Sequence, residues 1–164
     1  KIDVLINNAG DVLQRASFTN CDLNLFTRTI NLNLLSPIML TKELIPLLLK
    51  SKNPVVINMS SIASRTGGTP NSIHYGVAKA GLNTFTKAIS NYNKKLRVVG
   101  IAPSIVDTDF QKKHSTKERI KKIINETPLK RIGTTEDITN LVEFLISEKA
   151  SYITGETIFI TGGR

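Results

Sequence analysis

The sequence predicts an α/β fold, an open wound sheet of parallel strands with helices on both faces. Short apolar runs alternate along the chain with longer segments of helical periodicity, in the order strand, helix, strand, helix, strand, helix, strand. The residues Val55-Val56-Ile57 are consecutive and β-branched, which is typical of a strand buried on both faces. Strands that alternate with helices are joined by crossovers and therefore lie parallel.

Length and composition narrow the class of protein. A chain of 164 residues, 40% hydrophobic and 21% charged, has room for one domain with a core, and this composition excludes a disordered chain. The single Cys21 excludes an intramolecular disulfide. The longest apolar run, 44–49, is far shorter than the roughly 20 residues that cross a bilayer, and no targeting segment is visible. We expect a cytoplasmic protein with no membrane partner.

The first two elements are a strand and a long helix. The run over 2–6 reads as a strand because it is apolar and ends in the turn sequence Asn7-Asn8-Ala9-Gly10. A helical pattern follows over 22–50, and Pro37 and Pro46 interrupt it. The first strand is apolar on both faces, and such a strand at a sheet edge is an aggregation hazard. We therefore expect the chain to begin in the middle of its fold.

The central part of the chain supplies two more strands and the helix between them. Residues 54–59 form the second predicted strand, and a loop rich in Gly and Thr over 66–70 leads into a helix over 72–92. The third strand covers 96–102 and stops at Pro103, which has no N–H to donate.

The last two elements follow a basic segment. A helix is predicted over 136–147, with Thr134 or Thr135 as its N-cap. The final strand covers 157–160 and is closed by Gly162-Gly163.

Positive charge is concentrated in one part of the chain. The net charge is +9, and residues 111–131 carry eight Lys or Arg against two Glu, a local net charge of +6. Such a stretch is compatible with a solvated helix face, with an acidic partner or with nucleic acid. No aromatic residue is interleaved with these charges, which argues against a nucleic-acid surface. We expect no nucleic-acid partner.

Tyr75 and Lys79 are the strongest candidates for chemistry. At i, i+4 on a helix they share one face. A Lys charge about 5 Å from a phenol favours the phenolate and lowers the Tyr pKa by about 2 units. The pair alone is common by chance, but Ser61 follows the preceding strand, where the carboxyl ends of parallel strands face a ligand crevice.

Asn33 is a further candidate because Pro37 lies four residues later in the same helix. Proline has no N–H, so the carbonyl of Asn33 loses its helical partner and is free to bind a water. The alternative is that Pro37 only kinks a long helix.

These motifs together resemble the short-chain dehydrogenase/reductase family of the compact, single-domain type, over essentially the whole chain. The segment 7–10, which follows a strand, is similar to that family's fourth-strand motif. The segment 103–108 resembles its cofactor-closing segment, and 151–155 together with the terminal Gly-Gly resembles its C-terminal strand. Its catalytic tetrad is matched in order and approximate spacing by Asn33, Ser61, Tyr75 and Lys79.

The resemblance implies a Rossmann-like sheet that binds NAD or NADP and passes hydride between nicotinamide and a carbonyl or alcohol carbon. Tyr75 would exchange a proton with the substrate oxygen, and Ser61 would hydrogen-bond that oxygen. Lys79 would lower the Tyr75 pKa and hold the nicotinamide ribose. The Asn33 carbonyl would hold a water in a proton relay from Lys79 to solvent.

The resemblance also implies the remaining cofactor contacts and no metal site. The predicted cofactor-binding residues, besides Tyr75 and Lys79, are Asn8, Ala9 and Gly10 on the adenosine side and Val106 and Thr108 at the carboxamide.

Three departures from the family pattern stand out. The family's Gly-rich first turn, which places the pyrophosphate at a helix N-terminus, lies outside these residues. So does the end of the second strand, where a side chain would select NAD or NADP, and NADP is favoured by the resemblance alone. Residues 1–164 are therefore expected to be the C-terminal portion of one dinucleotide-binding catalytic domain, without its N-terminal βαβαβ part. Ser104 replaces the usual Gly, which is tolerated if its φ is negative, and Val99 replaces a frequent Asn.

The substrate is predicted from the basic segment. Residues 115–125 occupy the position of the family's substrate lid, and loops of this kind control access. Together with Lys52, Lys94 and Lys95, the positive charge suits a carrier-bound substrate, so a reductase similar to those acting on 3-oxoacyl thioesters of acyl carrier protein is expected. The alternative is a sugar, polyol or steroid-type alcohol dehydrogenase, and a catalytically silent scaffold is the alternative of another class.

The resemblance also suggests a homo-oligomer, a tetramer or dimer, with the helices over 22–50 and 72–92 paired across a two-fold axis. Leu82, Phe85 and Ile89 form an apolar stripe that could serve this contact, or that could face the protein's own sheet.

Overall fold

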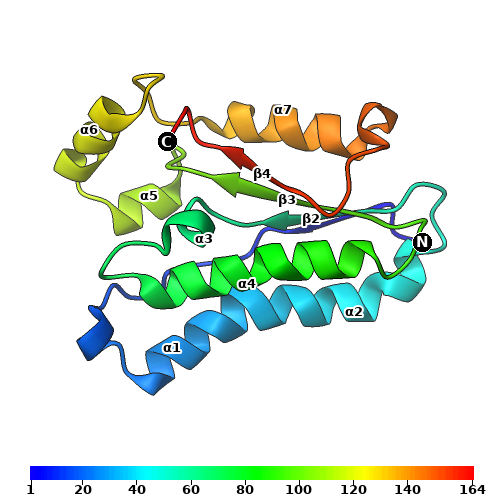
Figure 1. Ribbon diagram of the computed structural model, residues 1–164, viewed down its shortest axis with the longest axis horizontal. Helices are drawn as coiled ribbons and strands as arrows, with labels where there is room; N and C mark the ends of the chain where they lie inside the picture. Colours follow the sequence, from blue (N-terminus) through cyan, green and yellow to red (C-terminus); the bar gives the residue numbers. More distant parts are fainter.

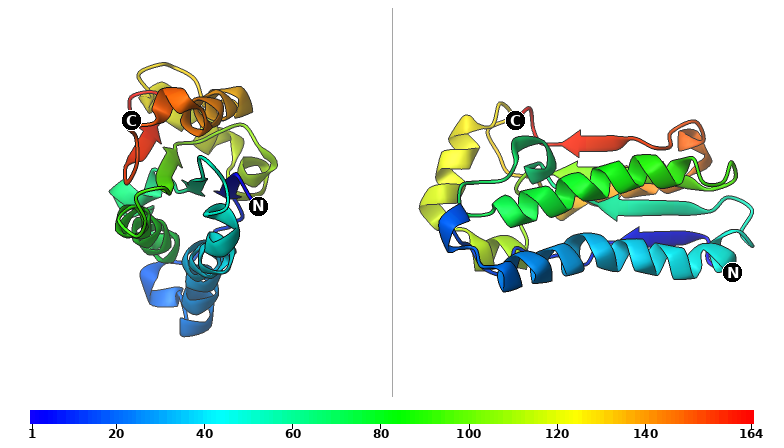
Figure 2. Two further views of the ribbon diagram at one scale, coloured as in Figure 1. Left: turned by 90° about the vertical axis from the view of Figure 1, so that its right-hand side faces the viewer. Right: turned by 60° about the horizontal axis from the view of Figure 1, so that its bottom comes forward.

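A computed structural model describes residues 1–164 as one parallel sheet between two layers of helices (Figures 1 and 2). The sheet has the order β1-β2-β3-β4, in which the strands are β1 (Val4–Asn7), β2 (Val55–Met59), β3 (Arg97–Pro103) and β4 (Thr157–Ile160). The helices are α1 (Leu23–Ile30), α2 (Ser36–Leu48), α3 (Ala63–Thr66), α4 (Ile73–Ser90), α5 (Asp109–His114), α6 (Lys117–Glu126) and α7 (Thr135–Ile146), with short turns η1 (Phe18–Asn20), η2 (Asn31–Leu35) and η3 (Glu148–Ala150). The predicted wound parallel α/β sheet is confirmed.

Because all strand pairs are parallel, the carboxyl ends of the strands meet at one edge of the sheet. The register pairs Val4 with Val55, Val56 with Val98 and Gly100 with Thr157. In Figure 1 all four arrows point toward the end of the molecule that carries α5 and α6. β1 pairs only with β2 and forms one edge of the sheet.

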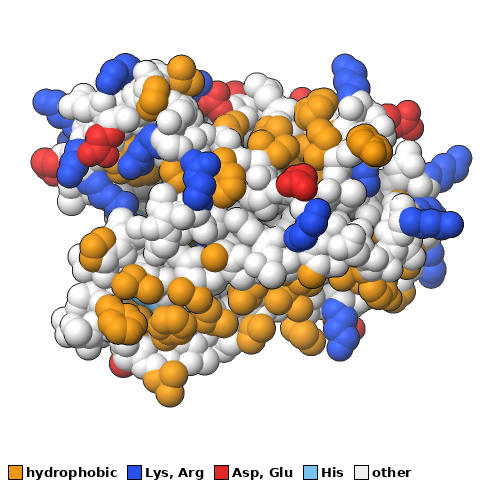
Figure 3. Space-filling view, viewed as in Figure 1, with side chains coloured by type: hydrophobic (Ala, Val, Ile, Leu, Met, Phe, Trp, Pro, Cys, Tyr) orange, Lys and Arg blue, Asp and Glu red, His pale blue; other side chains and the backbone are white.

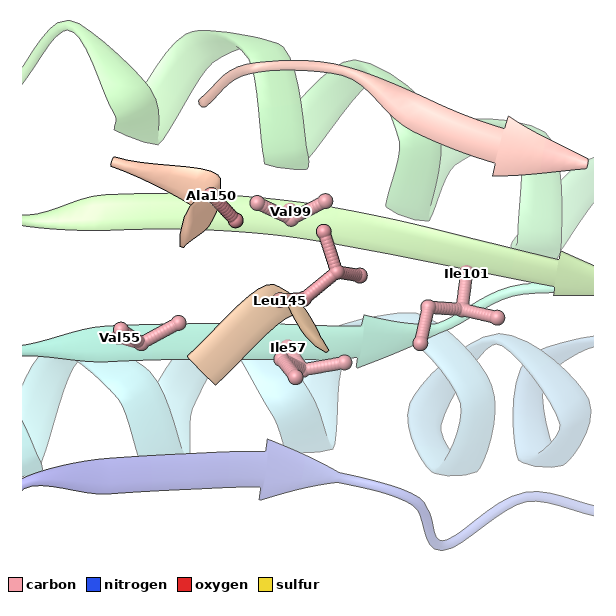
Figure 4. Packing of buried hydrophobic residues seen from close by; sticks show 6 residues of the cluster. All are labelled: Val55, Ile57, Val99, Ile101, Leu145 and Ala150. Atoms are coloured by element: carbon pink, nitrogen blue, oxygen red, sulfur yellow. The ribbon is translucent and has the colours of Figure 1, made fainter. Parts of the chain in front are cut away.

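Successive residues of the central strands alternate between two cores. Val55 and Ile57 face α7, where they pack with Leu145 in the cluster of Figure 4. Val56 between them faces the other way and packs with Leu48 of α2. Both faces of the sheet are therefore dry, which explains the continuous apolar runs in the sequence. Val99, a departure from the family pattern, is fully buried in the α7-side core.

The helical pattern predicted over 22–50 forms one continuous helical run from α1 through η2 to α2. The regular α-helical bonding changes near Pro37 and not at Pro46. Asp22 caps α1 by accepting from the Leu25 N–H at 2.7 Å. The turn η2 is a π-helix directly before Pro37, whose missing N–H favours such a change in bonding. Pro46, predicted as a second interruption, lies inside α2 without ending it.

Helices also form at two places where the sequence analysis assigned none. The short α3 directly precedes the Gly-rich loop, and its C-cap is Gly67, whose φ of 77° is left-handed. The basic segment forms α5 and α6, and Figure 3 shows Lys and Arg side chains gathered over these helices. The expected cap of α7 is Thr134, which forms a capping box with Asp137.

A chain of buried polar side chains crosses the α2–α4 side of the molecule. The Asn7 side-chain amide donates to the Thr41 hydroxyl at 3.0 Å and to Asn58 Oδ1 at 2.8 Å, and the Asn58 side-chain amide donates to the Thr86 hydroxyl at 2.9 Å. These bonds tie α2, β1, β2 and α4 together just before the turn at Asn8. No helix combines the length and the apolar character needed to span a membrane.

Candidate active site

A cleft of about 880 Å³ opens at the carboxyl ends of the strands, below α5 and α6. Most of the predicted site residues line it, namely Asn8, Gly10, Ser61, Tyr75, Lys79, Val106 and Thr108. Ala9 is exposed and does not line the cleft, and Asn33 lies buried behind its wall. The parallel topology thus gathers segments that are far apart in the sequence.

Ser61 comes from the segment that follows strand β2, and Tyr75 comes from helix α4. Ser61 follows β2, and its Oγ accepts from the Ala63 N–H at 3.2 Å. Tyr75 lies in the first turn of α4, partly buried. Ser61 is also a hydrogen-bond partner of the Tyr75 phenol and lowers its pKa. The two hydroxyls therefore face the same part of the cleft.

Lys79 lies one turn further along α4 and is almost completely buried. Its ammonium donates to the Met59 carbonyl at 2.7 Å and lies 5.7 Å from the centre of the Tyr75 ring. Burial lowers the pKa of Lys79 to about 8 because the charged form is removed from water. The side chain is thus a desolvated cation beside the phenol.

The predicted pKa of Tyr75 is wrong for this structure. Burial raises the pKa to about 12, Ser61 opposes that rise, and the Asp11 carboxylate adds to it. The Lys79 ammonium donates to the Met59 carbonyl, and its proximity to the ring does not offset the rise caused by burial. Tyr75 is therefore a protonated phenol, able to donate, at neutral pH.

Gly10 makes room for a close approach of Asn33 and Lys79. A Cβ at Gly10 would lie 2.7 Å from Asn33 Oδ1 and 3.1 Å from Lys79 Nζ. The Asn33 side chain is held by Asp11, whose N–H donates to Oδ1 at 3.2 Å and whose carbonyl accepts from Nδ2 at 2.7 Å. Asn33 therefore fixes the loop after β1 through its side chain, a role that sequence reasoning did not assign.

The segment after β3 closes the far side of the cleft. Val106 forms a parallel bridge with Gly133, and the Thr108 hydroxyl donates to the Val106 carbonyl at 3.2 Å. Ser104 is unstrained, since Leu13 and Lys130 are the non-glycine residues with positive φ, and its N–H donates to Ile160 at 3.1 Å. Replacement of the usual Gly is therefore tolerated, as predicted.

Sequence reasoning missed a polar cluster at the cleft mouth. His114 Nε2 lies 2.5 Å from Asp11 Oδ1, and Lys113 Nζ lies 2.6 Å from Asp11 Oδ2. Arg15 and Arg119 line the cleft beside them. The net charge of the basic segment was a signal for Arg119, whereas nothing in the sequence marked Arg15.

Comparisons with known proteins agree with this geometry. A family model described as enoyl-(acyl carrier protein) reductase matches residues 1–164. The chain is 34% identical over 165 residues to the 3-oxoacyl-[acyl-carrier-protein] reductase FabG of Rickettsia felis, a match that covers 99% of this chain and 67% of the relative. The chain thus spans about two thirds of the length of such curated relatives.

Solved structures give the same result. A short-chain dehydrogenase/reductase described as glucose/ribitol dehydrogenase, from Brucella melitensis, superposes with a TM-score of 0.92 at 33% identity, covering 99% of this chain and 64% of that one. A 7α-hydroxysteroid dehydrogenase complexed with NADH and 7-oxo glycochenodeoxycholic acid gives a TM-score of 0.92 at 31% identity, with the same coverage of 99% and 64%. The whole-length family match and these relatives show that the chain belongs to the short-chain dehydrogenase/reductase family.

Proposed function

We propose that this chain acts as an NAD(P)-dependent oxidoreductase that interconverts a carbonyl compound and a secondary alcohol. The observation that carries the proposal is the meeting of Ser61, Tyr75 and Lys79 around one cleft, with Asn33 behind Gly10. A cleft with a proton donor, a second hydroxyl and a buried cation suits reduction of a polarised carbonyl.

The residues present fit a nicotinamide cofactor. Gly10 has no side chain, so the loop after β1 packs against Asn33 and Lys79 where a Cβ would clash, and Lys79 offers a desolvated cation to ribose hydroxyls. Asn8 and Gly10 would contact the cofactor on one side of the cleft, and Val106 and Thr108 on the other. When bound, the nicotinamide supplies or accepts the hydride.

Proton transfer falls to Tyr75. Its raised pKa keeps the phenol protonated at neutral pH, so it can donate to the substrate oxygen in the reducing direction. Ser61 hydrogen-bonds that oxygen and stabilises the charge that develops on it. The main-chain carbonyl of Asn33, in the π-turn before Pro37, would hold a water that returns a proton toward Lys79.

The proposed substrate is a 3-oxoacyl thioester carried by an acidic partner such as acyl carrier protein. The positive charge on α5 and α6 at the cleft mouth supports it (Figure 3), as does the likeness to the Rickettsia felis reductase. The second candidate is a steroid or sugar alcohol, supported by the likeness to a hydroxysteroid dehydrogenase and to a glucose/ribitol dehydrogenase.

One assay separates the candidates. The protein is mixed with NADH or NADPH and either acetoacetyl thioester or 7-oxo bile acid. In parallel it is mixed with the oxidised cofactor, NAD⁺ or NADP⁺, and an aldose, and nicotinamide absorbance is followed. Consumption of cofactor with the thioester alone supports the first candidate, and turnover of the steroid or sugar alone supports the second. If no carbonyl or alcohol changes the absorbance with either cofactor, the oxidoreductase proposal fails.

A further inference from the structure

Two arginines, Arg15 and Arg119, line the same wall of the cleft from distant parts of the chain. Arg15 lies in the loop after β1 and Arg119 lies in α6, and both are partly buried. Arg15 Nε donates to the His114 carbonyl at 3.1 Å, and Arg119 Nη1 donates to the same oxygen at 3.4 Å. The shared acceptor holds the two guanidinium groups side by side, although their charges repel.

Neither guanidinium has a carboxylate partner. Eight ion pairs occur in the structure, and none includes Arg15 or Arg119. The nearby Asp11 is engaged by Lys113 and His114. Glu126 is the one acidic residue that lines the cleft, and it is engaged by Arg164 at 3.5 Å and by Lys122 at 3.8 Å.

The arginine pair is held close to the proposed proton donor. His74, directly before Tyr75 in α4, is buried, and its Nε2 lies 3.1 Å from the Gln14 carbonyl and 3.3 Å from that of Val12. These contacts attach the loop that carries Arg15 to α4. The charge of Arg15 accordingly lowers the pKa of the Tyr75 phenol, although burial outweighs it.

Partly buried guanidiniums without a counter-ion attract anions. A guanidinium binds a carboxylate or phosphate through two parallel N–H bonds, and this pairing is stronger where water is partly excluded. The remaining N–H groups of both arginines have no carboxylate partner, so an entering anion would satisfy them.

We propose that Arg15 and Arg119 form an anion-binding subsite at the substrate end of the cleft, and that the substrate carries a carboxylate or phosphate group in addition to its reacting carbonyl. The proposal rests on the proposed oxidoreductase function, since it concerns the substrate of that reaction. A thioester of a phosphorylated carrier arm and a small oxo acid both supply this chemistry, and the experiment separates them.

The test is calorimetric binding to the purified protein with defined probes. Phosphopantetheine represents the carrier arm, succinate represents a small dicarboxylate, and pantetheine is the neutral counterpart of the first. AMP represents a cofactor phosphate. The variants are Arg15→Gln, Arg119→Gln and Arg119→Lys, and Lys121→Gln is the matched control, because Lys121 is exposed on α6 and does not line the cleft.

We expect phosphopantetheine or succinate to bind and pantetheine to bind at least tenfold more weakly than phosphopantetheine. Arg119→Gln and Arg15→Gln should each weaken the anion by about 10- to 100-fold, because each removes a charge-assisted hydrogen bond. Arg119→Lys keeps the charge but not the paired N–H groups and should give an intermediate loss. Lys121→Gln should leave binding within about twofold of wild type.

Several outcomes would overturn the subsite. The first is equal binding of phosphopantetheine and pantetheine together with no binding of succinate. The second is a loss of anion affinity in Lys121→Gln as large as that in the arginine variants. The third is arginine-dependent binding of AMP alone, which would assign Arg15 and Arg119 to the cofactor. Binding needs no hydride transfer. Arginine-dependent anion binding without turnover of any substrate would therefore contradict the proposed function and leave the subsite in place.

Discussion

At the scale of single residues, burial decides the protonation of the site. Lys79 and Tyr75 are one helical turn apart, yet the ammonium is bonded to the Met59 carbonyl and the pKa of the phenol rises rather than falls. The i, i+4 spacing on a helix predicts that two side chains lie close together. It does not predict the direction in which the polar end of each side chain points. Both groups therefore sit closer to their neutral forms than their spacing suggested.

Removal of the Tyr75 hydroxyl should abolish turnover. We expect Tyr75→Phe to lower kcat by about 10²- to 10⁴-fold, because proton transfer to the substrate oxygen is lost. Tyr152→Phe is the matched control, since Tyr152 is fully exposed and does not line the cleft. Steady-state rates for both variants provide the check, and a Tyr75→Phe enzyme with near wild-type kcat would contradict the assigned role.

The buried charge of Lys79 should cost stability in a pH-dependent way. Its pKa is 10.5 in the unfolded chain and about 8 in the folded protein, so the unfolded state binds more protons between these values. The penalty is fully present below pH 8 and fades as the pH rises to 10.5. Lys79→Met removes it, and its stability relative to wild type should fall by about 3 kcal/mol across that window.

Urea unfolding of wild type and Lys79→Met at a series of pH values measures this difference. At pH 7 the variant gains up to about 3 kcal/mol, reduced by about 1 kcal/mol for the lost hydrogen bond to Met59. Lys121→Met, on the exposed face of α6, should follow the wild-type pH dependence. A difference between wild type and Lys79→Met that stays constant over this window would show that Lys79 keeps an ordinary pKa in the fold.

At the scale of elements, buried amides hold the catalytic end of the sheet together. Asn7 and Asn58 bridge β1 and β2, and their outer partners Thr41 and Thr86 lie on α2 and α4. The turn at 8–10 and the residues after β2 start directly beyond these bridges. Their positions in the cleft therefore depend on this polar chain.

Substitution of Asn58 tests that dependence. Asn58→Leu keeps the side-chain size but removes one of the two acceptors of the buried Asn7 amide, so we expect a loss of about 1–3 kcal/mol in the free energy of unfolding. Asn53→Leu, at an exposed position shortly before β2, should change it by less than about 0.5 kcal/mol. Equal effects of the two substitutions in urea titrations would mean that the buried bonds contribute nothing net.

At the scale of the whole molecule, apolar surface remains on the α2 and α4 side (Figure 3). Leu35, Met39 and Leu40 are each 45–49% exposed along the η2–α2 run, and Val77 of α4 is 47% exposed. Two residues of the apolar stripe on α4 face the protein's own sheet, the second of the two predicted alternatives, since Leu82 is 1% exposed and Ile89 packs on the α2-side core. Contiguous exposed apolar residues mark interaction surfaces, and we propose a second copy of this chain as the partner.

A charge in this surface should disrupt such an assembly. We expect wild type to elute as a species larger than 18.1 kDa and Met39→Glu to shift toward the monomer, because a carboxylate would be buried without a partner. Leu129 is also apolar and is 65% exposed, but it follows α6 and is not part of the η2–α2 run. Leu129→Glu should therefore leave the assembly intact. Light scattering during size-exclusion chromatography gives the masses, and a monomeric wild type would refute the proposal.

The sequence by itself determined the succession of strands and helices along the chain, the parallel sheet and part of the lining of the cleft. Local chemistry carries this information: β-branched runs predict buried strands, Thr134 is one of the two predicted caps of its helix, and parallel strands bring their carboxyl ends to one edge. Ser61, Tyr75 and Lys79 could be selected because the last two share a helix and the first ends the preceding strand.

Only the tertiary structure decided the electrostatics of the cleft. Burial depth sets the pKa values of Tyr75 and Lys79, and burial is a property of the packed molecule rather than of any segment. The pairing of Arg15 with Arg119 joins residues about a hundred positions apart in the sequence, through a carbonyl whose location depends on the whole chain path. Long-range contacts of this kind leave no local pattern, which is why the sequence did not mark them.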